Sequence, residues 1–500
     1  MIKQTRIYTP VLLILVFMVL GCGLEELGGV MGDMEALSKL GLRQVESAVI
    51  PVTAGGEKEK TPDLLILNRR LDPPPIEFYL SYVYKEGDRW EVRWEHNLGS
   101  DIIGDTDVTT LTDKARVYMI VGPTVQALKL SDGTVEWETP LSDEIGATCR
   151  ECAALAKDRL VVLTSDLVLQ GVNINSGEIE WSYEMKTSLG WQVKPIVLGQ
   201  GDKIALVDQT DPDAAAPRVL QVFKTEDGEQ FQSIMPQCSD IPLKVSSPMF
   251  IDQEGKNVYF TFSSGITHCI QGWDIENGRM LWEKTLPEEI SKDPSFFNNP
   301  HLDNPGLLTD DVLYYGFGGP AQKGKLININ LSDGAINLLL EDPKYAITPL
   351  LKNDGILLVR ASRTKGSEQD ELWAVDIPSG EILWQHELQT SDLMGWGSND
   401  SGVGTWTLVP VGGRLAVIQI ISEGGGSAPY YVVVEILNTQ DGAITAETKT
   451  LVNDGHWVGT SSTKYRAYLS IRNLYSVNLE TGDVGWEWPL IAPPPDLIGQ

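Results

Sequence analysis

The chain has 500 residues, of which 42% are hydrophobic and 22% charged, and its formal net charge is −30. This composition supports a large buried core and excludes a broadly disordered protein. The acidic balance argues against binding of nucleic-acid phosphates, which needs stripes of Lys and Arg. Fourteen Trp, 48 Gly and 28 Pro indicate many turns and large packing side chains, and five Cys are too few for a disulfide-based scaffold.

Residues 1–21 are predicted to be a secretory signal peptide. Lys3 and Arg6 supply its positive charge, and the apolar run from Val11 to Leu20 is about half of the roughly 20 residues that a membrane-spanning helix needs. The run ends in Val19-Leu20-Gly21-Cys22, which resembles a bacterial lipobox. The resemblance implies that Cys22 is lipidated and begins the mature chain; a signal peptide with an incidental Cys is the alternative.

Residues 22–77 are predicted to be a lipidated tether, with a short helix between Met31 and Val49. Because residues 1–21 carry two cations and no acid, cleavage brings the net charge to −32, and anionic lipid surfaces should repel the body. Gly23 stands after Cys22, where an Asp would indicate retention at the inner membrane. We therefore expect an exported protein that is lipid-anchored at the periplasmic face of the outer membrane and stands off the lipid surface.

The remaining four Cys are even in number in an exported chain, so two disulfides are expected. Cys149 with Cys152 and Cys238 with Cys269 are the natural pairs, although the sequence leaves three pairings open. A four-thiolate zinc site is the alternative. Ala153 follows Cys152, which excludes c-type haem attachment because that needs C-x-x-C-H.

A repeat with a mean spacing of about 50 residues runs through the body. Eight Gly residues each end one strand-like run and begin another, and Asp, Asn, Ser or Thr stands directly before each of them. An apolar residue stands five positions before every one of these Gly residues, and Trp stands four positions after five of them. The turn glycines are Gly133, Gly177, Gly228, Gly278, Gly334, Gly380, Gly442 and Gly482, and the five Trp are Trp137, Trp181, Trp282, Trp384 and Trp486.

These positions alternate with a period of two on both sides of the turn, which indicates hairpins with one apolar face per strand. A unit of about 40–50 residues is the size of a four-stranded propeller blade. Each Trp would bury some 150–250 Å² against the next blade. We therefore predict an all-β propeller of four-stranded antiparallel blades, with these five Trp and Trp94 packing between blades.

The segments that end in Trp137, Trp384 and Trp486 resemble the PQQ-type repeat, roughly A-x-D-x-x-T-G-x-x-x-W. The resemblance covers about residues 90–490. The family has two branches: quinoprotein dehydrogenases, and non-enzymatic envelope lipoproteins of the machinery that assembles outer-membrane β-barrels. Both branches are typically eight-bladed, so the resemblance implies an eight-bladed propeller, which we place at residues 78–490, followed by a Pro-rich tail at 491–500.

The segment from Val92 to Gly99 repeats the pattern around Trp94 without the hairpin before it. We expect this strand to close the ring by pairing into the last blade, because that hides both sheet edges. The count is then nine Trp-type strands for eight blades. Either one strand lies outside the ring, or one weak copy, at Gly228 or Gly442, is not a blade.

The sequence assigns no catalytic, cofactor-binding or metal-binding residue. The quinoprotein branch implies pyrroloquinoline quinone (PQQ), a metal ion and commonly a disulfide between adjacent Cys, and this chain has no Cys-Cys pair. The five His show no metal-ligand spacing. His96 and His386 follow Trp94 and Trp384 at the same offset, which indicates a repeat position.

The longest gap between repeats contains Trp396 and Trp406 in a Gly-rich segment. The pair would form an aromatic platform for sugar or peptide, and an ordinary loop followed by a strand is the alternative. The lipid anchor and the repeat-filled body without an assignable active site predict a non-catalytic envelope lipoprotein. Its propeller would dock protein partners, among them the outer-membrane assembly components that the resemblance implies. A PQQ-dependent dehydrogenase and a carbohydrate- or peptide-binding propeller are the alternatives.

Overall fold

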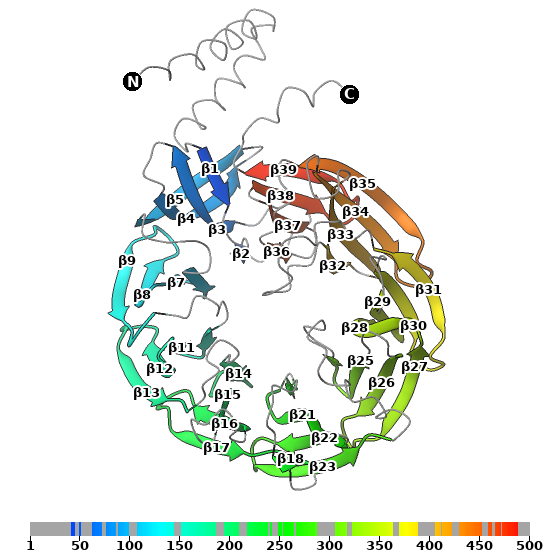
Figure 1. Cartoon of the computed structure of the whole chain (residues 1–500). Coiled ribbons are helices and arrows are strands. Elements are labelled where there is room, and N and C mark those ends of the chain that lie inside the picture. Colours follow the sequence, from blue (N-terminus) through cyan, green and yellow to red (C-terminus); the bar gives the residue numbers. More distant parts are fainter. Residues whose placement is uncertain are drawn as a thin grey trace, which may run out of the picture.

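The structure is a computed structural model, which describes residues 42–45, 50–51, 63–72, 77–86, 89–99, 108–144, 152–186, 195–209, 218–238, 241–242, 249–252, 254–264, 267–287, 306–317, 323–363, 370–388, 406–411, 413–422, 430–452, 459–462, 466–471 and 473–488. Nine sheets stand in chain order around a central axis, from blue to red in Figure 1. Neighbouring strands pair antiparallel in all of them. The described residues contain strands and no helix, so the predicted all-β propeller with mostly four-stranded blades is confirmed.

The sheets follow one another along the chain. The first comprises β1 (Leu42–Val45), β2 (Ile50–Pro51), β3 (Leu64–Asp72), β4 (Glu77–Glu86) and β5 (Arg89–Gly99). The second sheet comprises β6 (Val108–Thr112), β7 (Arg116–Val121), β8 (Thr124–Lys129) and β9 (Val135–Pro140). The third comprises β10 (Ala153–Ala156), β11 (Arg159–Leu163), β12 (Val168–Asn173) and β13 (Ile179–Glu184). The fourth comprises β14 (Ile196–Leu198), β15 (Lys203–Gln209), β16 (Arg218–Lys224) and β17 (Gln230–Ile234).

After a small pair, β18 (Gln237–Cys238) and β19 (Ile241–Pro242), five four-stranded sheets complete the ring. They comprise β20 (Met249–Ile251), β21 (Asn257–Ser264), β22 (Thr267–Asp274) and β23 (Arg279–Thr285); β24 (Gly306–Leu308), β25 (Val312–Phe317), β26 (Gly324–Asn330) and β27 (Ile336–Asp342); β28 (Tyr345–Asn353), β29 (Ile356–Arg363), β30 (Glu371–Asp376) and β31 (Ile382–Glu387); β32 (Trp406–Val411), β33 (Arg414–Ser422), β34 (Tyr430–Asn438) and β35 (Ile444–Val452); β36 (Gly459–Ser462), β37 (Arg466–Ile471), β38 (Asn473–Asn478) and β39 (Val484–Trp488).

Each repeat of the sequence forms the third and fourth strands of a sheet. At the first repeat, Gly133 N–H donates to the Lys129 carbonyl at 2.8 Å, and Lys129 N–H donates to the Thr134 carbonyl at 2.9 Å. All eight turn glycines have φ between 59° and 77°, a region that residues with a Cβ rarely adopt. The local turn chemistry therefore fixes where each outer strand begins.

The ring contains nine sheets where eight were expected, and the difference lies at its amino end. The strand around Trp94 is β5, which pairs with β4 of its own sheet and does not enter the last one. Part of the expected tether also differs: Leu42–Val45, within the expected helix, is strand β1, and Leu64–Asp72 is strand β3. Because the side chains from Leu64 to Leu67 are all buried, this segment packs as part of the ring. All nine Trp-type strands are thus outer strands of nine sheets.

The ring closes through side-chain packing between its first and last sheets. Leu64, Ile66 and Val83 of the first sheet form one buried cluster with Tyr468 and Leu474 of the last, and the two sheets lie side by side in Figure 1. Among the described strands, none is shared between them. The other hydrophobic clusters also lie between neighbouring sheets, so the core of this protein is distributed around the ring.

Candidate functional site

The outer strand of a sheet carries the Trp that contacts the next sheet. Trp282 on β23 is 8% exposed, and its Nε1 donates to the carbonyl of Leu331 at 2.8 Å. Leu331 lies three positions before the turn glycine of the following sheet. The same bond joins Trp94 to Leu130 (2.9 Å), Trp137 to Ile174 (3.0 Å), Trp181 to Thr225 (2.9 Å) and Trp384 to Thr439 (3.1 Å). Trp486 lies opposite Tyr475 at the corresponding position of β39, and its side chain is outside the described part of the structure.

The turn glycine has a second role at this contact. A Cβ on Gly334 would lie 2.5 Å from Cε3 of Trp282, which is too close for a real contact. An added Cβ would clash in the same way with the Trp of the preceding sheet at four other turn glycines: Gly133, Gly177, Gly228 and Gly442. Their positive φ accounts for glycine at the turn itself. The structure shows that they also leave room for the indole ring.

A small residue usually faces each Trp across its own hairpin. Gly171 pairs with Trp181, Gly272 with Trp282, Ala127 with Trp137 and Ala374 with Trp384. Where the Trp is missing, the partner is larger: Val222 pairs with Gln232, Ile327 with Leu338 and Ile436 with Ala446. At β27, Leu338 is nonetheless 48% exposed, so the larger partner does not place it in the seam.

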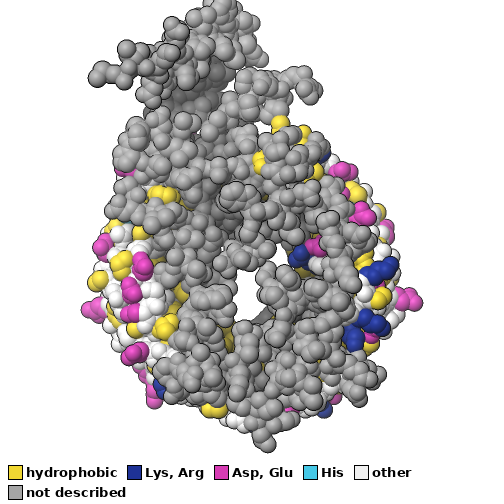
Figure 2. Space-filling model, viewed as in Figure 1, with side chains coloured by type: hydrophobic (Ala, Val, Ile, Leu, Met, Phe, Trp, Pro, Cys, Tyr) yellow, Lys and Arg dark blue, Asp and Glu magenta, His cyan; other side chains and the backbone are white. Residues whose placement is uncertain are grey.

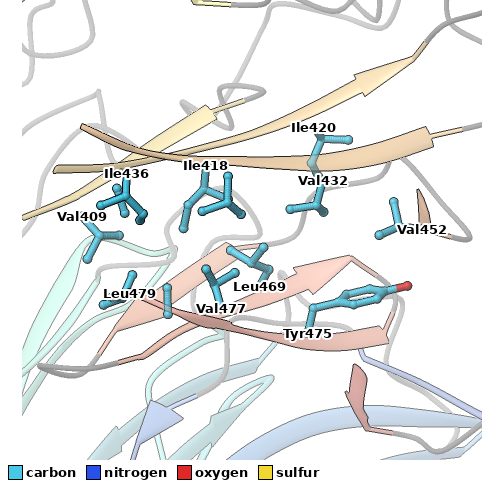
Figure 3. Close-up of a cluster of buried hydrophobic side chains, with 13 residues drawn as sticks. Val409, Ile418, Ile420, Val432, Ile436, Val452, Leu469, Tyr475, Val477 and Leu479 are labelled. Carbon is cyan, nitrogen blue, oxygen red and sulfur yellow. The ribbon is translucent and has the colours of Figure 1, made fainter. Parts of the chain in front are cut away.

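The seam between the last two sheets shows how a missing Trp is replaced. Ala446 stands at the Trp position of β35, and the sheets instead meet through thirteen buried, mostly aliphatic residues. Figure 3 shows Ile418, Ile420 and Val432 of one sheet facing Leu469 and Val477 of the other. Apolar packing therefore takes the place of the indole contact at this seam, and Arg414 Nη1 donates to the Glu480 carbonyl across it at 3.5 Å.

Two His form polar contacts between neighbouring sheets. His386 Nε2 lies 2.9 Å from Glu435 Oε2, and Gln419 Nε2 donates to the same oxygen at 3.0 Å. Glu435 is 6% exposed and Gln419 is fully buried. His96 Nε2 lies 3.2 Å from Gln126 Oε1, and Gln126 and Glu435 each stand seven positions before a turn glycine. Both His therefore occupy one repeat position, which joins an outer strand to the third strand of the next sheet.

Other polar side chains in the ring walls have structural partners. Tyr183 Oη donates to Asp208 Oδ2 at 3.0 Å, and the same carboxylate accepts the Lys186 N–H. Burial, followed by the Asp208 charge, raises the pKa of Tyr183 to about 12. Burial also lowers the pKa of His96. Both groups therefore make polar contacts between neighbouring sheets.

Three of the four body Cys lie in the described part of the structure. Cys152 and Cys269 are buried and disulfide-bonded. Cys238 lies on β18, and the adjacent Gln237 carbonyl accepts a hydrogen bond from Gln271 on β22, the strand that holds Cys269. Cys149 lies outside the described residues, and the pairings stay a prediction.

The remaining expected site residues lie largely outside the described part of the chain. Cys22 and Trp396 are not included, and Trp406 is described only as the first residue of β32. Within the described ranges, no group of three His, Cys, Asp or Glu is placed to hold a metal ion. In the same ranges, no helix is long and apolar enough to cross a membrane.

The outer rim of the ring is formed by the outer strands of the sheets. Figure 2 shows Asp and Glu side chains spread along the rim on both sides of the ring. Six of the eight exposed large hydrophobic residues lie on outer strands: Val135, Met280, Leu281, Leu338, Leu383 and Ile444. The rim thus presents an acidic surface with isolated apolar positions.

The fold, the turn glycines and the Trp seams define a β-propeller built from PQQ-type repeats. The model of the family described as "Outer membrane protein assembly factor BamB" matches residues 85–211 and 270–496. These ranges make up more than half of the chain, and the chain belongs to this family. The unmatched stretch contains the weak repeat around Gly228, whose outer strand carries Gln232 in place of Trp.

Several solved structures resemble the chain at low identity. BamB from Moraxella catarrhalis is 14% identical, with a TM-score of 0.39, over 87% of this chain and 98% of that one. The computationally designed Ika8 protein is 11% identical (TM-score 0.39; 76% of this chain, 96% of that one). Quinohemoprotein alcohol dehydrogenase from Comamonas testosteroni is 10% identical (TM-score 0.38; 76% and 66%). No curated protein matches the sequence, and similarity at this level supports no assignment of function.

Proposed function

We propose that this protein is a non-catalytic, membrane-anchored lipoprotein whose propeller docks other proteins during outer-membrane protein assembly. Membership of the assembly-factor family is the observation that carries the proposal. A propeller presents a rigid surface on which partners can dock without any chemistry of its own. The outer strands and the connections between sheets supply that surface.

The lipobox-like sequence supports the anchoring part of the proposal. Lipidation of Cys22 would hold the amino end of the tether at the membrane. The body carries a strong net negative charge, which anionic lipid would repel. The propeller would therefore be held near the membrane with its faces free for protein partners.

The anchor is tested by the Cys22→Ser variant. We expect the mature form to disappear from the membrane fraction and an uncleaved or released precursor to accumulate, because the lipid acceptor is lost. The matched control is Cys152→Ser, which removes a body Cys and should leave fractionation unchanged if the protein still folds. Normal membrane fractionation of Cys22→Ser would refute lipid anchoring.

Two further experiments separate docking from the alternatives. Crosslinking in native membranes should recover an outer-membrane assembly component; recovery of glycans alone would favour a carbohydrate-binding propeller. Incubation of the purified protein with PQQ and calcium should give no stoichiometric absorbance and no dye-linked alcohol oxidation. Turnover in that assay would refute the non-catalytic assignment.

A further inference from the structure

The hairpin between β22 and β23 has a different turn from the other seven repeats. In those seven, the N–H of the turn glycine donates to the carbonyl four positions before it, at 2.8–3.0 Å. Between β22 and β23, strand pairing continues to Asp274 and Arg279, one position closer to the turn glycine than in the hairpin of Gly133. Among the described residues, Gly278 N–H has no such backbone acceptor. This turn therefore leaves the amide nitrogen of its glycine without the hydrogen bond that the other turns supply.

The residue before this glycine is also different. Asn277 stands where the other seven repeats have Asp, Ser or Thr, and Asn277-Gly278 is the only Asn-Gly pair in the sequence. The Asn277 side chain is exposed to solvent. The carbonyl carbon of an Asn side chain is open to attack by the backbone nitrogen of the next residue, and glycine has no Cβ to hinder that attack. The turn therefore brings together the two groups that are needed for loss of the Asn side-chain amide.

Asp274 holds the Asn277 side chain in place. Asn277 Nδ2 donates to Asp274 Oδ2 at 2.7 Å, and Asn277 N–H donates to Asp274 Oδ1 at 3.0 Å. Arg279 Nε also donates to Asp274 Oδ2, at 3.3 Å. The side-chain contact depends on the amide of Asn277, because an ionised carboxylate has no proton to donate. A carboxylate at position 277 would instead place two negative charges side by side, and charges of the same sign repel each other.

The turn contacts the preceding sheet of the ring. Lys203 Nζ on β15 donates to Glu276 Oε2 at 2.7 Å, and Ile275 is 1% exposed in a hydrophobic cluster that the two sheets share. Gly278 packs against the side chain of Gln232 on β17, which stands where other outer strands carry Trp. This seam has no indole contact of the kind that joins Trp282 to the next sheet, so a change in the turn acts directly on a contact between sheets.

We propose that Asn277 is a site of spontaneous deamidation, which changes the charge and the backbone of this turn as the protein ages. The Gly278 nitrogen forms a bond to Asn277 Cγ, the Cγ–Nδ2 bond breaks, and ammonia leaves with the proton of the Gly278 N–H. Water then opens the resulting cyclic imide at one of its two carbonyls and gives aspartate or isoaspartate. One water is consumed and one ammonia is released, and no cofactor or oxidant takes part. Either product carries a new negative charge beside Asp274, and isoaspartate also lengthens the backbone by one carbon.

The test keeps the full-length, folded protein at physiological temperature in mildly alkaline buffer and follows its peptides by mass spectrometry. The peptide that contains Asn277 should gain about 1 Da, faster than a peptide that contains any other Asn. Asp333→Asn is the matched variant, because it creates an Asn-Gly pair in a turn where Gly334 N–H donates to the Asn330 carbonyl at 2.8 Å. The new pair should deamidate roughly fivefold more slowly than Asn277, since this hydrogen bond must first break. Asn277→Gln should gain no mass at position 277 over the same period.

The effect on the turn is measured with Asn277→Asp, which introduces the charge of the product. Asn277→Ser is its control, because it removes the amide without adding charge and carries the residue that two other turns have at this position. Asn277→Asp should unfold at a lower urea concentration than Asn277→Ser, since only the former places a charge beside Asp274. Three results would overturn the proposal: no gain of mass at Asn277, equally fast deamidation in Asp333→Asn, or the same urea midpoint for Asn277→Asp as for the wild type.

Discussion

Removal of one indole ring tests whether the Trp seams hold the ring of sheets together. Trp282→Ala deletes a side chain that is 8% exposed, together with its hydrogen bond to the Leu331 carbonyl. Trp282 also contributes to a buried cluster with Tyr259, Phe250 and Tyr315, and its ring stacks on Tyr259 at 6.0 Å. The variant therefore leaves a cavity between two sheets.

The magnitude follows from the buried area. A Trp side chain buries about 150–250 Å², which at about 25 cal/mol/Å² corresponds to roughly 4–6 kcal/mol. The hydrogen bond adds about 1 kcal/mol, and partial collapse of the neighbours offsets some of the loss. We expect the free energy of unfolding to fall by about 3–5 kcal/mol. Trp282→Phe keeps most of the ring but leaves the Leu331 carbonyl without its donor, at a cost of about 1–2 kcal/mol.

The assay is urea unfolding followed by circular dichroism, with the midpoint and the slope compared between variants. Leu338→Ala is the matched control, because Leu338 stands at the same repeat position but is 48% exposed. This variant should lower the free energy of unfolding by less than about 1 kcal/mol. If Trp282→Ala costs no more than Leu338→Ala, the seams do not stabilise the ring in the way described.

Three further predictions concern the turn glycines, the Cys and one partly buried Tyr. Gly334→Ala should destabilise the protein more than Gly355→Ala: both residues have positive φ, but only Gly334 contacts an indole ring, since a Cβ on Gly355 would meet nothing within 4 Å. Equal losses in urea unfolding would show that turn conformation is the whole effect. Peptide mapping without reduction should find Cys149–Cys152 and Cys238–Cys269, and any other pairing, free thiols or bound zinc would contradict the prediction. Because burial raises the pKa of Tyr183 to about 12, above the unfolded value of about 10, its contribution to stability is complete below pH ~10 and is lost as the pH rises to about 12. Tyr183→Phe should therefore lose less stability than the wild type over that range, and identical profiles would contradict the assignment.

The hairpins were predictable because their determinants are close together in the sequence. A glycine with positive φ, an Asp or Asn before it, and apolar residues with a period of two act within about ten residues. The strands that flank Gly133 and Gly177 lie where these signals place them. The contacts of the outer Trp with the next sheet also follow, because a blade must bury that face.

The first sheet was not predictable from the same signals. Its third and fourth strands, β4 and β5, are ten and eleven residues long, so their turn lies further from Trp94 than the turn glycine lies from the Trp in the other repeats. Trp90 stands where the repeat requires Gly. The run from Leu64 to Leu67 is apolar without alternation, as in a strand that is buried on both faces, and so gave no period-two signal. The partners of His96 and His386 were also hidden, because contacts across 30 and 49 residues depend on how the sheets pack.

In the β24–β27 sheet, the missing indole contact and the exposed Leu338 have a common structural origin. Only Pro343 and Lys344 connect β27 to β28, and the backbone of β28 lies directly against Gly316 and Gly324, where no Cβ would fit. This close approach replaces the indole contact that joins other sheets. Leu338, at the position where a Trp would be buried, is left on the surface. The hairpin register also differs: Leu338 pairs with Ile327, seven positions before Gly334, whereas Trp282 pairs with Gly272, six positions before Gly278. The exposed Leu338 is therefore found where both the Trp is lost and the register of the hairpin is shifted.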